Sequence, residues 1–231
     1  MRILIYFSSH RQLKEIEYSS EFFNRTSFLK EYSDVMLHCD NDSYNDELIK
    51  SYAKYETNTF LVRSPQIRRI YDHHNGWSPI GCLGIIKGLN NNFHSFNNYD
   101  FVIHTVPDCY ITNEEMIRKL ILEESTTDNK FIVDQHSYIN ESCKTQFSGD
   151  FFIFKPKEIH NIFSEHDDDN PPVLENWIYD KIKEHQIKHR IICREGSPYW
   201  NIDSYGLIHN HNLLRIESIL NGCENLDHRH Y

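Results

Sequence analysis

The fold is decided by the stretch Tyr99-Asp-Phe-Val-Ile-His-Thr-Val-Pro-Asp-Cys-Tyr-Ile111. Residues 101–103 are apolar β-formers, which predicts a short strand that is buried on both faces. Pro107 cannot donate a backbone hydrogen bond to a neighbouring strand, so we expect the strand to end there. Asp108 is therefore predicted at the carboxyl end of a central strand, where open α/β sheets bind their ligands. The alternative is that Asp108 simply belongs to a turn.

Strand-like and helix-like segments alternate before this stretch. Apolar runs at residues 2–7, 34–39 and 59–62 predict strands, and residues 22–32 and 46–55 have helical patterns between them. This alternation is typical of a parallel sheet that is covered by helices on both faces.

The second half continues the alternation. Residues 112–115 (Thr-Asn-Glu-Glu) have the pattern of a capping box that opens a helix. A strand at 149–156 begins beside Asp150 and ends at a proline, and a helix is predicted over 172–184. Residues 206–211 are expected to lead into a last helix that stops at Gly222. Together the two halves predict a single α/β domain over residues 1–231.

Composition limits the classes of function. The chain has 24 basic and 34 acidic residues, a formal net charge of −10, and no long basic block. Nucleic acid and anionic membranes are therefore poor partners, because phosphate contacts need clustered Lys and Arg. The six cysteines lack Cys-x-x-Cys spacing, and no stretch reaches the ~18 apolar residues of a membrane span. These features predict a cytoplasmic protein with no membrane span and with reduced cysteines.

A loop followed by a glycine-containing helix is the second informative segment. Asn75-Gly76 leads to Ser78, a good N-cap, and to Pro79, which suits the first helical position. Apolar residues then recur at helical spacing up to Leu89. The glycines of this helix lower helix propensity and are expected to allow close packing on the sheet or on a ligand: Gly81, Gly84 and Gly88.

The order of these motifs resembles the GT-A-fold glycosyltransferases, which use nucleotide sugars. In that family an Asn-Gly loop and a helix similar to residues 75–89 precede an Asp-x-Asp motif, as they here precede Asp108. Residues 149–156 are similar to the acceptor-side strand of small viral and bacterial sugar transferases, and His209 is similar to a late histidine that completes the metal site. The resemblance implies a Rossmann-like GT-A domain with a mostly parallel central sheet flanked by helices on both faces.

The resemblance also implies an activity and a division of the chain. Residues 1–111 would form the nucleotide-sugar-binding half and residues 112–231 the acceptor-binding half. The implied reaction moves a sugar from a UDP-, GDP- or dTDP-sugar to a hydroxyl group of a glycan or glycoconjugate acceptor. The donor is expected to lie against polar and small residues of the first half: Ser8, Ser9, Arg11, Asn75, Gly76 and Asp108.

One departure from the family concerns the metal. Only Asp108 remains of the Asp-x-Asp pair, because Val106 and Tyr110 occupy the positions two residues away. Mn²⁺ or Mg²⁺ beside a diphosphate is often held by only one or two carboxylates, and Mn²⁺ also accepts imidazole. Asp108 and His209 are therefore the expected metal ligands, and the alternative roles of His209 are helix capping or core packing.

Two carboxylates are candidates for the general base. Inverting transfer requires a carboxylate that deprotonates the acceptor hydroxyl, for which Asp150 is the first candidate and Asp134 the second. Each is open to the simpler interpretation of a residue at a strand end or in a turn.

Two other classes of function remain open. A non-catalytic protein that binds sugar nucleotides or glycans with the same fold is favoured by the missing second acidic residue. A metal-dependent hydrolase is suggested by the 15 histidines, but no His-x-His-x-Asp or His-Glu-x-x-His cluster is present. The nearest approaches, His73-His74 and His209-x-His211, have no carboxylate at the required spacing.

Overall fold

The computed structural model describes residues 1–9, 13–39, 59–63, 79–136, 146–167, 174–193, 203–204, 207–209 and 212–222. In this part of the chain a seven-stranded sheet has the order β3-β2-β1-β4-β7-β6-β8, and a three-stranded sheet has the order β5-β10-β9. The predicted helix at 46–55 and the loop at 75–78 lie outside the described residues.

The first half of the large sheet is parallel. β1 (Ile3–Ser9) pairs with β2 (Ser33–Cys39) on one side and with β4 (Phe101–Thr105) on the other, and β3 (Thr59–Arg63) extends the sheet beyond β2. Phe101 and Ile103 pack into one core cluster, whereas Val102 packs into the cluster on the opposite face. The prediction of a central strand buried on both faces is confirmed.

The second half introduces an antiparallel strand. β7 (Gln146–Phe154) runs antiparallel to both β4 and β6 (Phe131–His136), and β8 (His189–Cys193) pairs in parallel with β6. The mostly parallel sheet is thus confirmed. β7 begins at Gln146, before the predicted start at Gly149, and therefore carries Asp150 in its interior.

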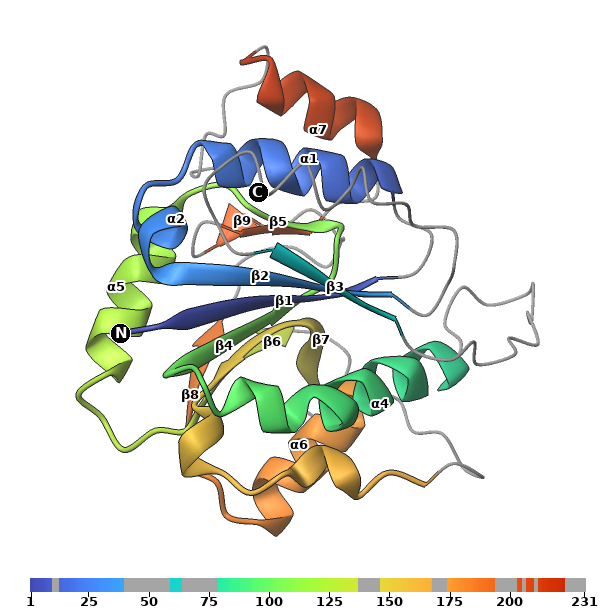
Figure 1. Cartoon of the computed structure of the whole chain (residues 1–231), viewed down its shortest axis with the longest axis vertical. Coiled ribbons are helices and arrows are strands. Elements are labelled where there is room, and N and C mark those ends of the chain that lie inside the picture. The colour runs from blue at the N-terminus through green and yellow to red at the C-terminus, as the bar shows by residue number, and fades with distance from the viewer. Residues whose placement is uncertain are drawn as a thin grey trace.

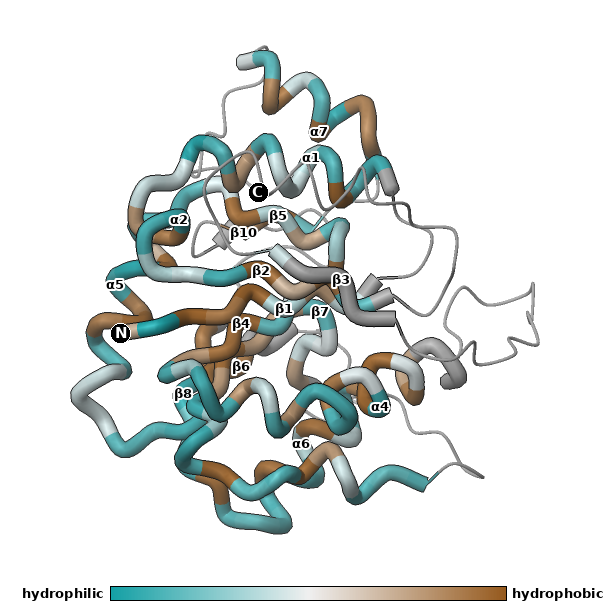
Figure 2. Tube along the Cα trace, in the orientation of Figure 1, coloured by the Kyte–Doolittle hydropathy of each residue, from teal (hydrophilic) through white to brown (hydrophobic). Residues whose placement is uncertain are grey.

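Helices cover both faces of the sheet, as Figure 1 shows. On one side lie α1 (Leu13–Asn24), α2 (Phe28–Tyr32) and α5 (Glu114–Glu124), and on the other lie α4 (Pro79–Phe96) and α6 (Leu174–Glu184). In the tube view hydrophobic residues, in brown, run along β1 and β4 at the centre of the sheet (Figure 2). The α/β class with helices on both faces is therefore as predicted.

The glycine-containing helix α4 lies close to the sheet. A Cβ atom added to Gly88 would come within 2.3 Å of His38 Cε1 and 2.7 Å of the Tyr6 hydroxyl oxygen. Only a glycine permits this approach, which agrees with the packing role expected for Gly88.

Two local predictions around α2 and α5 are wrong. The predicted helix at 22–32 is broken between Asn24 and Phe28, where the Thr26 hydroxyl donates to the Phe23 carbonyl. The helix predicted to open at 112–115 begins at Glu114, but its N-cap is Asn113 and not Thr112: Asn113 Oδ1 accepts from the Glu115 amide at 3.0 Å. Glu114 instead accepts from the Leu29 amide at the start of α2, because that distant amide has no helical carbonyl to bond.

The end of the chain returns to the centre of the molecule. Residues 207–209 form strand β10 (Leu207–His209), which pairs antiparallel with β5 (Cys109–Ile111) and with β9 (Asp203–Ser204). The sequence predicted a lead-in to a helix at this position. The helix that follows, α7 (Leu213–Leu220), stops just before Gly222 as predicted, and Gly222 has a φ of +70° that suits glycine.

No described helix combines the length and the apolar character needed to cross a bilayer.

Candidate functional site

The small sheet brings Asp108, Asp150 and His209 together. His209 Nδ1 lies 3.2 Å from Asp150 Oδ2, and His209 Nε2 lies 3.8 Å from Asp108 Oδ2. The side chains of Asp108 and His209 are only 7% and 5% exposed, and that of Asp150 is 22% exposed. Three residues that are far apart in the sequence therefore form one nearly buried cluster.

Backbone and side-chain hydrogen bonds fix the turn that carries Asp108. The Val106 amide donates to the Asp150 carbonyl at 3.1 Å, so the turn after β4 is tied to β7. The Ser19 hydroxyl on α1 donates to the Pro107 carbonyl at 2.9 Å. His209 is brought opposite Cys109 by the register of β10 against β5. Each of the three elements thus places one of the polar side chains.

The geometry of His209 suits a metal ligand. Nδ1 is at hydrogen-bond distance from Asp150, and an imidazole that donates Nδ1–H to a carboxylate presents the Nε2 lone pair on its other side. That side faces Asp108 at a separation too long for a hydrogen bond. Adjacent ligands of an octahedral ion, each about 2.0–2.1 Å from it, lie roughly 2.9 Å apart, so a side-chain shift of about 1 Å would bring these two atoms from 3.8 Å onto one ion. The residues present therefore fit the predicted pair of ligands.

A buried carboxyl group that the sequence analysis did not select lies beside Gly149, the residue before Asp150 in β7. Glu175, in the first turn of α6, is 7% exposed, and its Oε2 has no hydrogen-bond partner. Burial, and secondarily repulsion from Asp150, raises the pKa of Glu175 to about 7. Its Oε1 lies 3.2 Å from the position that a Cβ atom would take at Gly149. Such a group can exchange a proton near neutral pH.

The sequence contained a signal for Glu175. Positions 175, 178 and 182 share one face of a helix, and Ile178 and Ile182 are buried. A glutamate on the apolar stripe of a helix is unusual enough to mark a candidate site.

The structure describes the side chains of only some of the remaining predicted site residues. Ser8 is buried, and its hydroxyl lies 3.1 Å from His104 Nε2. Asp134 belongs to β6 at an irregularity of its pairing with β7, and its side chain is outside the described part, as is that of Ser9. Three of the predicted donor-binding residues lie outside the described residues: Arg11, Asn75 and Gly76.

Comparison with known proteins gives similarity in structure but not in sequence. No protein-family model matches the chain, and no curated protein matches its sequence. A candidate glucose-1-phosphate thymidylyltransferase from Bacillus anthracis, solved with a sucrose, matches at a TM-score of 0.56 and 9% identity, over 99% of this chain and 98% of the other. A candidate nucleotide-diphospho-sugar transferase from Desulfovibrio desulfuricans G20 matches at a TM-score of 0.51 and 9% identity, over 98% of this chain and 100% of the other. A mannosyltransferase from Pyrobaculum calidifontis, solved with GDP-Man and Mn²⁺, matches at a lower TM-score of 0.45 and 11% identity. The match covers 67% of this chain and 44% of the other.

The first two matches span whole chains, so the protein has the α/β fold that nucleotide-sugar transferase-like proteins adopt. Identities of 9% show the fold alone. The activity has to be argued from the cluster of Asp108, Asp150 and His209.

Proposed function

We propose that the protein is a glycosyltransferase that moves a sugar from a nucleotide-diphosphate sugar to a hydroxyl group of a glycan or glycoconjugate. The observation that carries the proposal is the buried contact of His209 with Asp108 and Asp150, next to the end of the central strand β4. Ligands of open α/β sheets bind at this edge. The fold likeness to a candidate nucleotide-diphospho-sugar transferase supports the same class of donor.

Asp108 Oδ2 and His209 Nε2 would hold the divalent ion, Mn²⁺ or Mg²⁺. Such an ion, when bound, offsets the charge that develops on the diphosphate leaving group. Asp150 would accept the Nδ1–H of His209 and so keep Nε2 unprotonated and aimed at the site. A neutral imidazole is the form that binds metal.

The acceptor hydroxyl has to lose a proton as the new bond forms. Glu175 suits this role because its pKa of about 7 lies near the operating pH and one of its oxygens is unpartnered. Asp150, the first candidate from the sequence, is already engaged with His209. We therefore propose Glu175 as the base and Asp150 as a residue that positions His209.

The proposal is tested by product analysis. The purified protein is given UDP-, GDP- and dTDP-sugars with Mn²⁺, and release of the nucleoside diphosphate is measured with and without glycan acceptors. We expect release that Asp108→Asn lowers by at least about 100-fold, because a group that stabilises the developing charge is lost. Asp100→Asn is the matched control, since that exposed carboxylate pairs with Lys157 at 2.8 Å in another part of the fold.

Other outcomes contradict the proposal in different ways. Pyrophosphate release from a nucleoside triphosphate and a sugar 1-phosphate would make the protein a nucleotidyltransferase. Donor binding without turnover would favour the non-catalytic alternative. Equal turnover by Asp108→Asn and Asp100→Asn would exclude Asp108 from the site.

A further inference from the structure

A second group of side chains of the types that bind metals lies on the segment around a 3₁₀-helix and at the end of α6, the helix labelled near the bottom of Figure 1. His160 and Glu165 flank the short 3₁₀-helix η2 (Ile162–Ser164), and His185 directly follows the last residue of α6. One ligand atom from each of these three residues lies within 4.8 Å of the others. Among the described residues this is the one group of three in which one ligand atom from each residue lies within 4.8 Å of the other two.

The contacts within the cluster are already close. His160 Nε2 lies 3.3 Å from Glu165 Oε1, His185 Nε2 lies 2.9 Å from Glu165 Oε2, and the two imidazole rings are 4.3 Å apart at their centroids. Ligands of a tetrahedral zinc ion are roughly 3.3 Å apart, given bonds of about 2.0–2.1 Å. Small side-chain rotations would therefore bring the three donor atoms around one ion.

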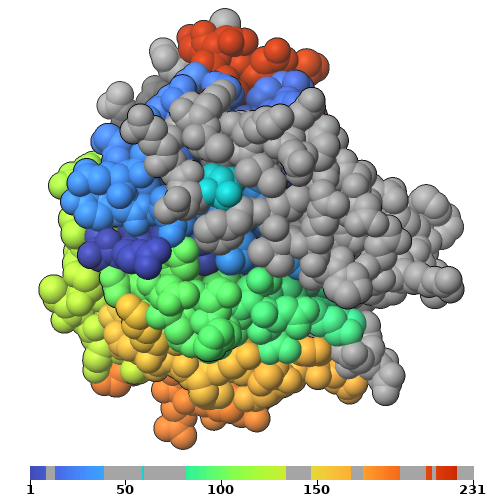
Figure 3. Space-filling model, viewed as in Figure 1, coloured from blue at the N-terminus to red at the C-terminus, as the bar shows by residue number. Residues whose placement is uncertain are grey.

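Buried neighbours hold the two segments in place. Phe163 in η2 is fully buried and stacks on Trp177 of α6 with ring centroids 6.0 Å apart. Asn161 donates to Asn90 of α4 at 2.7 Å, and Figure 3 shows α4 in green directly against the yellow-orange segment after β7. The segment that carries two of the ligands is thus anchored just before η2 and within it, which lowers the entropy cost of binding an ion.

Lys181 supplies an outer contact for the carboxylate. Its Nζ donates to Glu165 Oε2 at 2.8 Å, which leaves Oε1 toward His160. Ligating carboxylates in proteins are commonly oriented by such outer contacts.

We propose that His160, Glu165 and His185 form a zinc site that joins the segment after β7 to the end of α6. Two imidazoles and one carboxylate are ligands that zinc favours, and three protein ligands leave the fourth position to water. The site uses none of the residues assigned to sugar transfer, so it stands independently of the proposed function.

The test measures zinc binding and zinc-dependent stability of the full chain. Protein stripped with a chelator is titrated with ZnCl₂ against a chromogenic zinc indicator, and its melting temperature is followed at each addition. We expect one equivalent of tight binding and a rise in the melting temperature. His160→Ala and His185→Ala should each weaken this binding by more than the roughly 10- to 100-fold that loss of an outer contact causes.

Two controls keep the outcome interpretable. His94→Ala removes an exposed imidazole at the end of α4 and should bind zinc like the wild type. Circular dichroism shows whether each alanine variant is folded. Glu165→Gln keeps the size of the side chain, so it tests the site even where an alanine variant does not fold. Zinc that leaves the wild-type melting temperature unchanged, or that binds Glu165→Gln as tightly as the wild type, would overturn the proposal.

Discussion

At the scale of single residues, the fold opposes ionisation of the Glu175 carboxyl group. The pKa of Glu175 rises from its ordinary 4.5 to about 7, mainly through burial and further through Asp150. Between these two values the folded protein retains a proton that the unfolded chain has lost. The free energy of unfolding therefore falls as the pH rises through this window, and the full cost above it is on the order of 3 kcal/mol.

Glu175→Gln tests this cost. The amide is neutral at every pH, so we expect the variant to be more stable than the wild type at pH 8 and to lose most of that advantage at pH 4.5. Urea denaturation at both values measures the difference. Asp180→Asn, on the exposed side of the same helix, is the matched control and should change stability little at either pH.

The same substitution separates stability from activity. If Glu175 accepts the proton of the acceptor, Glu175→Gln loses sugar transfer while it gains stability at pH 8. A variant that is less stable at pH 8 would contradict the assigned burial cost, whereas full transfer activity would contradict only the role as base.

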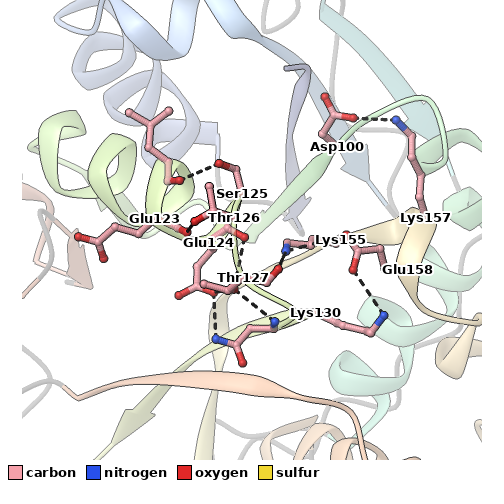
Figure 4. Close-up of polar contacts among 12 residues, drawn as sticks. Asp100, Glu123, Glu124, Ser125, Thr126, Thr127, Lys130, Lys155, Lys157 and Glu158 are labelled. Carbon is pink, nitrogen blue, oxygen red and sulfur yellow. Dashed lines mark hydrogen bonds and ion pairs between the residues drawn. The ribbon is translucent and has the colours of Figure 1, made fainter.

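At the scale of elements, the end of α5 is held by one buried carboxylate. The Glu124 side chain is 2% exposed and lies 2.9 Å from Arg190 Nη1 on β8. It also accepts from Thr127 and Asn129 in the turn after the helix, and Figure 4 shows it among the side chains of that turn. Although burial alone opposes it, these hydrogen bonds hold the pKa of Glu124 below its ordinary value.

Glu124→Gln should therefore destabilise the protein at pH 7 by about 2 kcal/mol, the typical loss of hydrogen bonds to a charged group. Neighbouring Glu123 is the matched control, because it contacts the same arginine at 2.8 Å but its side chain is 42% exposed. Glu123→Gln should cost less than about 1 kcal/mol. Urea denaturation measures both.

A pH series extends this test. The stabilisation by Glu124 is present above its unfolded pKa and is lost as the pH falls through its lowered pKa in the fold, so the gap between wild type and Glu124→Gln should close in acid. Equal losses from the two variants at pH 7 would show that burial of Glu124 has no energetic consequence.

Elements that depend on local pattern were predictable, and those that depend on distant partners were not. The apolar run at 101–103 reads directly as a buried strand. Glu114 was read as part of a local capping box, but its partner Leu29 lies 85 residues away. Strand β10 was missed because its three residues are ordered by β5, which no spacing in the sequence reveals. His209 was singled out by resemblance, whereas its contact with Asp150 required the fold.

At the scale of the whole molecule, a small satellite core joins the two ends of the chain. Ile216 and Ile219 of α7 pack with Phe22 of α1 and with Tyr110 and Ile208 of the small sheet. The large sheet has core clusters on both faces, and one of them also contains Cys109 and Leu207 of the small sheet. The face of the small sheet that packs on α7 is therefore expected to loosen with α7 while the large sheet stays folded.

Ile216→Ala tests this division. The residue is fully buried, so removing its side chain should cost about 2–4 kcal/mol within the satellite core. Hydrogen exchange should show faster exchange of the amides of β5 and β10, with those of β1 and β4 unchanged. Leu214→Ala, on the same helix but 78% exposed, is the matched control and should change neither the stability nor the exchange of these amides.

Uniform loss of protection across both sheets in Ile216→Ala would mean that the molecule opens as one unit. Unchanged protection of β5 and β10 would mean that α7 does not hold the small sheet in place.

The late position of β10 also has a consequence for biosynthesis. The ribosome makes the N-terminal part first, at a rate on the order of 5–20 residues per second. Asp108 and Asp150 therefore leave the exit tunnel before the imidazole of His209 has been translated. A nascent chain can therefore pair β1, β2 and β4 before the proposed cation ligands are complete, and only a chain translated past position 209 can acquire all of them.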